Sequence, residues 1–99
     1  MTMLFEWDDK KAAQNLAKHR ISFATAIHVF SDPMQLSAQD RVENGEYRWQ
    51  TIGMVEGRLL LLVAHAVFDD ESGAEVIRLI SARKADAKER KRYEKNDHH

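Results

Sequence analysis

Cysteine is absent from this 99-residue chain, and proline and glycine are scarce, with one proline and four glycines. Without cysteine the chain has no disulfide, thiol nucleophile or thiolate metal site, which fits a reducing compartment, and we expect a cytoplasmic protein. There is also no glycine-rich phosphate loop, no dinucleotide-binding fingerprint and no serine nucleophile elbow. These absences exclude several common kinds of enzyme site.

Long apolar runs are missing as well. The longest one, Leu59 to Phe68, is interrupted by His65 and is about half the length that a transmembrane helix needs. Asp8, Asp9 and Lys10 follow the first apolar residues almost at once, unlike the apolar stretch of a secretory signal. We therefore expect a soluble, unexported protein with no membrane partner.

Charge of both signs is abundant and is separated along the chain. Arg78 to Asn96 carries eight Lys or Arg and three acidic residues, a net charge of +5, whereas the remainder carries seven and thirteen, a net charge of −6. Because local potential steers association more than total charge does, the basic segment predicts a polyanionic partner. With 43% hydrophobic and 31% charged residues, the chain is expected to form one globular domain, residues 1–99.

The period of the apolar residues predicts the order of the elements. Alternation over residues 3–7 predicts a short strand, and two helices follow it, the first capped by Asp8 and the second by Ser22. From residue 34 the period is that of strands, with tight turns at Asn44-Gly45 and Glu56-Gly57 and a last strand over residues 76–82. Asp86 and Glu89 have the spacing of a capping box and begin a closing helix.

The predicted fold class is therefore α+β. We expect an N-terminal strand and two helices, an antiparallel β-meander of three to four strands, and a C-terminal helix, with the helices gathered on one face of the sheet.

Arg78 and Arg83 are the first candidates for chemistry, because one lies within the last strand and the other just past its end. Two guanidinium groups there could form a fork that holds a phosphate and stabilises a phosphorane-like transition state. The structural alternative, favoured by residue types alone, is that Arg78 pairs with an acid such as Glu75. Arg83 would then pair with a carboxylate of the closing helix, where Glu89 and Tyr93 could reach back toward it.

Asn15, Lys18 and His19 form a second candidate group at the end of the first helix. His19 could pass protons, Lys18 could hold a phosphate and Asn15 could orient either of them. The alternative is that Lys18 and His19 only satisfy the preference of helix C-termini for cations.

Arg48 stands between Tyr47 and Trp49, a pattern that can serve single-stranded RNA by stacking bases on the rings. More often such aromatics are core residues, and a lone histidine in an apolar strand, such as His65, is usually a core residue too. No histidine pair has the spacing of a metal site, so we expect neither a metal nor a cofactor.

Several of these segments together resemble the BrnT family of toxins from bacterial type II toxin-antitoxin systems. The opening motif of that family, W-D-x-x-K-x-x-x-N-x-x-K-H followed by an apolar-S-F triplet, is similar to the stretch from Trp7 to Phe23. Gly45-Glu46-Tyr47-Arg48-Trp49 resembles a second motif, and the stretch from Ile77 to Arg83, with Glu89, Arg90 and Tyr93, resembles the R-I-I-S-A-R ending. The departures are small: Arg20 and Leu79 replace a frequent Gly and Ile.

The resemblance implies a RelE-like fold, endoribonuclease activity that arrests translation, and inhibition by a BrnA-type antitoxin. The toxin would assemble with that antitoxin and meet DNA only through it. Cleavage would use the neighbouring 2'-hydroxyl without a metal. Arg78 and Arg83 would stabilise the transition state, Arg48 and Lys18 would support the RNA, and His19, or failing it Glu89 or Tyr93, would transfer protons. The rival interpretation is a noncatalytic RNA- or protein-binding module that uses the same basic surface.

Overall fold

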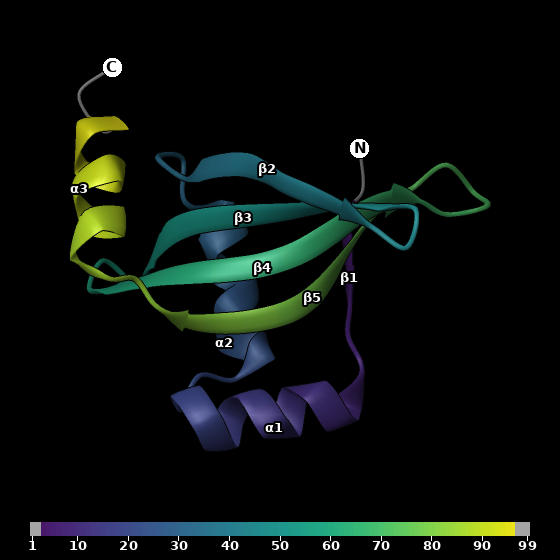
Figure 1. Ribbon diagram of the computed structural model, residues 1–99, viewed down its shortest axis with the longest axis horizontal. Helices are drawn as coiled ribbons and strands as arrows, with labels where there is room; N and C mark the ends of the chain where they lie inside the picture. Colours follow the sequence, from purple (N-terminus) through teal and green to yellow (C-terminus); the bar gives the residue numbers. More distant parts are fainter. Residues whose placement is uncertain (1–2, 97–99) are drawn as a thin grey trace.

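A five-stranded mixed sheet with the strand order β1-β5-β4-β3-β2 is the centre of the molecule (Figure 1). This computed structural model describes residues 3–96. The strands are β1 (Met3–Glu6), β2 (Leu36–Glu43), β3 (Glu46–Val55), β4 (Leu59–Asp69) and β5 (Glu75–Lys84). The helices are α1 (Asp9–His19), α2 (Phe23–Ala26), the 3-10 helix η1 (Ile27–Ser31) and α3 (Ala87–Asn96). None of these helices is long and apolar enough to cross a membrane.

Strands β2 to β5 form the expected antiparallel meander, which confirms the α+β class and the number of its strands. The two predicted tight turns are present, and their residues have positive φ: 53° and 77° at Asn44 and Gly45, and 54° and 71° at Glu56 and Gly57. Such turns match the twist of the flanking strands. Strand β1 was expected as well, and it pairs in parallel with the first half of β5. The resulting sheet is mixed.

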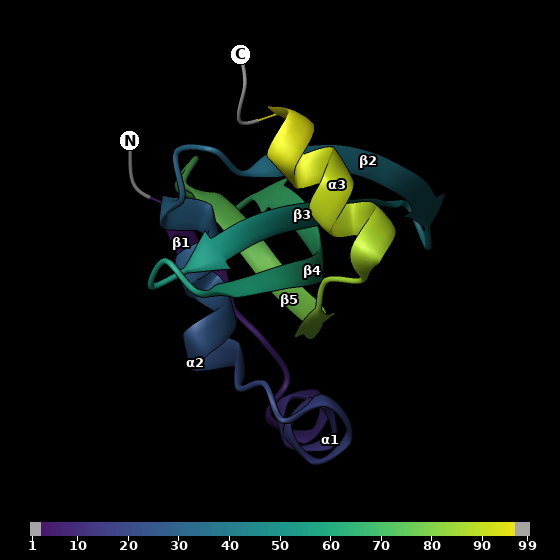
Figure 2. The same cartoon turned by 90° about the vertical axis from the view of Figure 1, so that its left-hand side faces the viewer.

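The helices cover both faces of the sheet, so the prediction that they gather on one face was wrong. Figure 2 shows α2 and α3 on opposite sides. One core joins Phe23 and Val29 to β4 and β5, and a second core joins Tyr93 of α3 to Leu60 and Leu62. The nearly continuous apolar run of β4 explains this arrangement, because a strand that is apolar on both faces needs cover on both.

Helix α1 lies along the edge of β5 and is joined to it by Asn15, which is only 6% exposed. The Asn15 Nδ2 donates to the Ala82 carbonyl at 2.9 Å, and the Asn15 Oδ1 accepts from the Ala82 amide at 3.0 Å. The same Nδ2 donates to the Ile21 carbonyl at 2.9 Å. Since β1 pairs with β5 only over residues 75–78, the Asn15 side chain takes the place of a strand partner at Ala82.

Helix α3 begins with the predicted capping box, which the structure confirms. The Glu89 amide donates to Asp86 Oδ1 at 2.8 Å, and the Asp86 amide donates to Glu89 Oε1 at 2.9 Å. Further along the helix, the Tyr93 hydroxyl donates to Asp32 Oδ2 at 2.6 Å, and the Met54 amide donates to the same oxygen at 2.7 Å. Burial raises the pKa of Asp32, but these hydrogen bonds outweigh it and lower the pKa. Asp32 therefore anchors α3 to the sheet.

Candidate active site

The three candidate arginines lie on one face of the sheet, the face that carries α3. Across neighbouring strands, Arg48 is in register with Ala66, and Ala66 is in register with Arg78. Residues in register point to the same face, and so do alternate residues of one strand. Leu62, which packs under α3, is in register with Arg83. It lies four residues before Ala66 on β4, so both side chains point to the same face. We call this side of the sheet the arginine face.

Arg78 is held by two carboxylates at the end of the sheet near β1. Its Nε donates to Glu6 Oε2 at 3.0 Å, and its Nη1 donates to Glu46 Oε2 at 2.7 Å. The guanidinium carbon lies 4.9 Å from the centroid of the Phe68 ring, a cation–π contact. The hydrogen bond that Arg78 donates to Glu6, opposed by partial burial and supported by the charge of Glu46, raises the pKa of Arg78. The guanidinium is therefore charged and fixed in position.

Arg78 pairs with acidic residues, as the structural alternative held, but Glu75, the acid named as an example, is not one of them. Glu75 lies three residues earlier on β5 and so points to the opposite face, where it lines a groove with Ile77. The true partners, Glu6 and Glu46, are 72 and 32 residues away in the sequence. The sequence analysis did not name Glu6 or Glu46 among the candidate site residues. One available signal was the spacing of Glu46 and Arg48, which are two residues apart and therefore lie on the same face of a strand.

Glu46 joins Arg78 to Arg48, because its other oxygen, Oε1, lies 3.4 Å from Arg48 Nη2. The Arg48 Nε is buried and has no hydrogen-bond partner among the described residues. Tyr47 and Trp49 alternate with Arg48 and line the groove on the opposite face. The pleat of β3 therefore places these two rings on the face opposite the Arg48 guanidinium, so a base stacked on either ring would not lie beside Arg48.

Arg83 pairs with the closing helix, as the structural alternative predicted. Its Nη1 and Nη2 donate to Glu89 Oε1 and Oε2, both at 2.8 Å, which is a bidentate ion pair. The hydrogen bond from Arg83, together with its charge, lowers the pKa of Glu89 against the opposing effect of burial. Tyr93, the other residue expected to reach toward Arg83, has its hydroxyl proton directed to Asp32.

Arg78 and Arg83 do not form a single fork. They are separated by five positions of β5, including one bulged residue, which corresponds to roughly 15 Å along the strand. Each one belongs to its own ion-pair cluster, near β1 for Arg78 and beneath α3 for Arg83. The arginine face thus offers two separate arginine clusters whose remaining N–H donors a chain of successive phosphates could contact.

Lys18 and His19 lie away from both clusters, in a cleft of about 260 Å³ between α1 and the edge of β5. Asn15 lines the same cleft, but both ends of its amide are bound to backbone groups of Ala82 and Ile21. The Asn15 side chain therefore does not orient Lys18 or His19, which was one of the two interpretations of this group. It holds the helix that carries them.

His65 is a core residue, as expected of a lone histidine in the most apolar strand. It is 3% exposed, its Nε2 lies 2.8 Å from Thr51 Oγ1, and its ring packs edge-on against Phe30. Burial lowers the pKa of His65 to about 4. Among residues 3–96, no group of three or more His, Asp or Glu is placed to hold a metal ion.

Comparison with known proteins identifies the family. A family model described as the ribonuclease toxin BrnT of a type II toxin-antitoxin system matches residues 7–89. The fold is similar to the crystal structure of the Brucella abortus ribonuclease toxin BrnT, with a TM-score of 0.62, 27% identity, and coverage of 86% of this chain and 99% of that one. No curated protein matches the sequence. The chain belongs to the BrnT family of ribonuclease toxins of type II toxin-antitoxin systems.

Proposed function

We propose that this chain is an endoribonuclease that cleaves RNA without a metal ion, by attack of a 2'-hydroxyl on the adjacent phosphate, and so arrests translation. The observation that carries the proposal is the placement of Arg48, Arg78 and Arg83 on one sheet face, each in contact with a carboxylate. A BrnA-type antitoxin would neutralise the toxin in a joint oligomer, and contact with DNA would occur through that antitoxin.

The nucleophile in this reaction belongs to the substrate. The 2'-oxygen forms a bond to phosphorus, the bond from phosphorus to the 5'-oxygen breaks, and the products are a 2',3'-cyclic phosphate and a free 5'-hydroxyl. The protein needs only to align these atoms, stabilise the added negative charge and move two protons. Arginine suits the second task, since it stays charged and offers planar donors that match phosphate oxygens.

The ion pairs prepare the arginines for this role. Each guanidinium has five N–H donors, and the carboxylates occupy only part of them, so a phosphate can bind to the rest. Glu6 and Glu46 fix the position of Arg78, and Glu89 fixes that of Arg83, before RNA arrives. Such preorganised charge stabilises a transition state without rearrangement during the reaction. Arg48 supports the same RNA strand from β3.

Proton transfer falls first to His19. Glu89 is a weaker candidate, because Arg83 lowers its pKa and a carboxylate with a low pKa is a poor base near neutral pH. Tyr93 is weaker too, since its hydroxyl proton is directed to Asp32.

The test is cleavage of RNA by purified protein, free of antitoxin, in the presence of EDTA. We expect fragments that end in 2',3'-cyclic phosphate or 3'-phosphate, and no cleavage of a 2'-O-methylated control RNA. Strict dependence on a divalent ion, or products with 3'-hydroxyl ends, would contradict this mechanism. Binding of RNA without any cleavage would favour the noncatalytic module instead. Induced expression in a bacterium, scored for growth and protein synthesis, tests the arrest of translation.

A further inference from the structure

The cleft between α1 and β5 has a composition unlike that of the arginine face. It is lined by three basic side chains, two amides and the strand edge, namely Lys11, Lys18, His19, Gln14, Asn15, Ile80 and Ser81. Within residues 3–96, no carboxylate forms an ion pair with any of the three basic side chains, whereas Arg48, Arg78 and Arg83 are all paired. The cleft is therefore a place where positive charge is not compensated.

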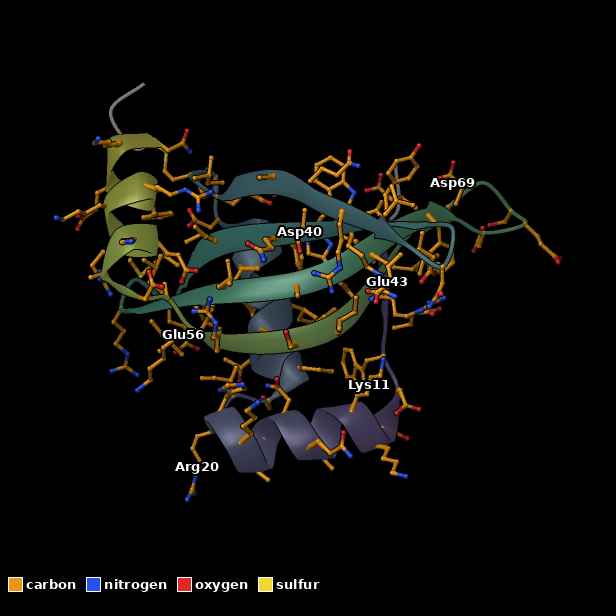
Figure 3. The ribbon with its side chains drawn as sticks, viewed as in Figure 1. Lys11, Arg20, Asp40, Glu43, Glu56 and Asp69 are labelled. Atoms are coloured by element: carbon orange, nitrogen blue, oxygen red, sulfur yellow. The ribbon has the colours of Figure 1, made fainter. Side chains whose placement is uncertain are left out.

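Helix geometry explains why these cations converge. Lys11, Asn15 and Lys18 stand at i, i+4 and i+7 on α1, so they share one side of the helix. Asn15 is bonded to the edge of β5, which means that the two lysines flank it and face the same edge. Figure 3 shows Lys11 on the side of α1 nearest β5, whereas Arg20 extends away from the sheet.

The position of the cleft relates it to the arginine face. Ser81 lines the cleft, and it lies two residues before Arg83 on the same strand, or roughly 7 Å along β5. Strand β1 ends its pairing at Arg78, so no strand separates the cleft from this part of β5. A strand of RNA that leaves Arg83 across the edge of β5 meets Lys18 and His19 next.

The C-terminus of α1 opposes anion binding to some extent, because a helix dipole places about half a negative charge there. Lys18 alone outweighs it, and Lys11, about two turns away, lies outside its reach. The cleft also has room for an anion, at about 260 Å³.

We propose that the cleft formed by Lys11, Gln14, Lys18 and His19 against the edge of β5 is a phosphate-binding subsite for the RNA backbone beside the cleavage position. This inference rests on the proposed ribonuclease function and adds a second binding region to it. Lys11 and Lys18 hold a phosphate next to the one that reacts, and Gln14 donates from its amide. Lys11, Lys18 and Gln14 position the strand without taking part in bond breaking at the reacting phosphate, whereas His19 keeps the proton-transfer role proposed above.

The experiment measures binding and catalysis in matched lysine variants of the intact chain. Lys11→Gln and Lys18→Gln remove a cleft charge, and Lys10→Gln removes an exposed charge from the same helix outside the cleft. Anisotropy with a fluorescent 2'-O-methyl RNA, which cannot be cleaved, should show affinity about two- to fivefold weaker for each cleft variant and little change for the control. The slope of log K against log salt should fall by about 0.7 per lost phosphate contact.

Cleavage kinetics separate this role from catalysis. On a cleavable RNA, each cleft variant should raise KM and leave kcat nearly unchanged, as expected when ground-state and transition-state binding are lost equally. If the cleft variants match Lys10→Gln in affinity and salt slope, or if they lower kcat at constant KM, the subsite does not exist as proposed. If the parent binds RNA but does not cut it, the enzymatic proposal fails, and the affinity and salt slope of the lysine variants alone decide the subsite. If the parent neither binds nor cuts RNA, both fail.

Discussion

Replacement of Asn15 by alanine should destabilise the protein more than alanine at any other position of α1, because Asn15 is the buried residue of that helix. The substitution removes three hydrogen bonds and leaves the Ala82 amide, the Ala82 carbonyl and the Ile21 carbonyl without their partner. Ala82 is fully buried and Ile21 is 5% exposed, so water cannot readily replace the amide. A buried polar group without a partner costs about 1–3 kcal/mol. We therefore expect a loss of on the order of 3–5 kcal/mol in the free energy of unfolding.

The isosteric change Asn15→Asp sharpens this test. One oxygen of the new carboxylate can still accept from the Ala82 amide, but the other replaces Nδ2 and faces the carbonyls of Ala82 and Ile21. Burial and these oxygens should raise the pKa of the carboxylate in the folded state. The penalty is then present above that raised pKa and is relieved as the pH falls toward the unfolded value, about 3.9. Relative to the parent, the variant should gain stability on acidification.

Urea unfolding followed by circular dichroism measures the free energy of unfolding of Asn15→Ala, and its change with pH for Asn15→Asp. Gln14→Ala is the matched control. Gln14 is the preceding residue, carries the same amide group, is exposed and lines the same cleft. A surface change of this kind should cost less than about 0.5 kcal/mol. If Asn15→Ala differs from Gln14→Ala by less than about 1 kcal/mol, the Asn15 amide does not join α1 to β5 as we argue.

Three further predictions concern titration, catalysis and inhibition. Because the pKa of His65 is lowered from 6.5 to about 4, the unfolded chain binds a proton more readily, so stability should fall as the pH drops through that interval, and His65→Gln should remove this dependence. Arg78→Ala and Arg83→Ala should each slow cleavage about a hundredfold and abolish toxicity, while the exposed Arg41→Ala should have no effect; equal toxicity of all three at equal abundance would place the site elsewhere. The antitoxin should protect residues 78–93 from hydrogen exchange and bind more slowly at high salt, whereas protection confined to residues 32–46 would indicate inhibition at a distance.

The local features of the fold were predictable because their causes lie within a few residues. The Asp86 and Glu89 capping box, the Ser22 cap and the turn at Asn44-Gly45 all follow from side chains that bond to nearby backbone or from a backbone that needs positive φ. The antiparallel order of β2 to β5 follows from turns too short for any other connection.

The features that were not predicted depend on contacts between distant residues. Nothing near residues 3–6 specifies a parallel pairing with β5, and nothing in α3 alone selects the face that it covers. The partners of Arg78 are hidden for the same reason, since Glu6 lies 72 residues away. The placement of Tyr47 and Trp49 opposite Arg48 could be predicted, because the side chains of a strand alternate between its two faces.

The pairing of every candidate arginine with a carboxylate separates two tasks that a basic segment could have performed together. Arg83 is neutralised by Glu89 before RNA arrives, so it contributes little to long-range attraction. The lysines of α3 form no ion pair within the described part of the chain, and neither do Lys11 and Lys18. Under the proposed function, attraction of RNA would fall to the lysines, and charge stabilisation would fall to the arginines held in place. Added salt should then weaken kcat/KM through binding and leave kcat nearly constant, because a screened lysine affects the encounter and a fixed guanidinium acts at contact.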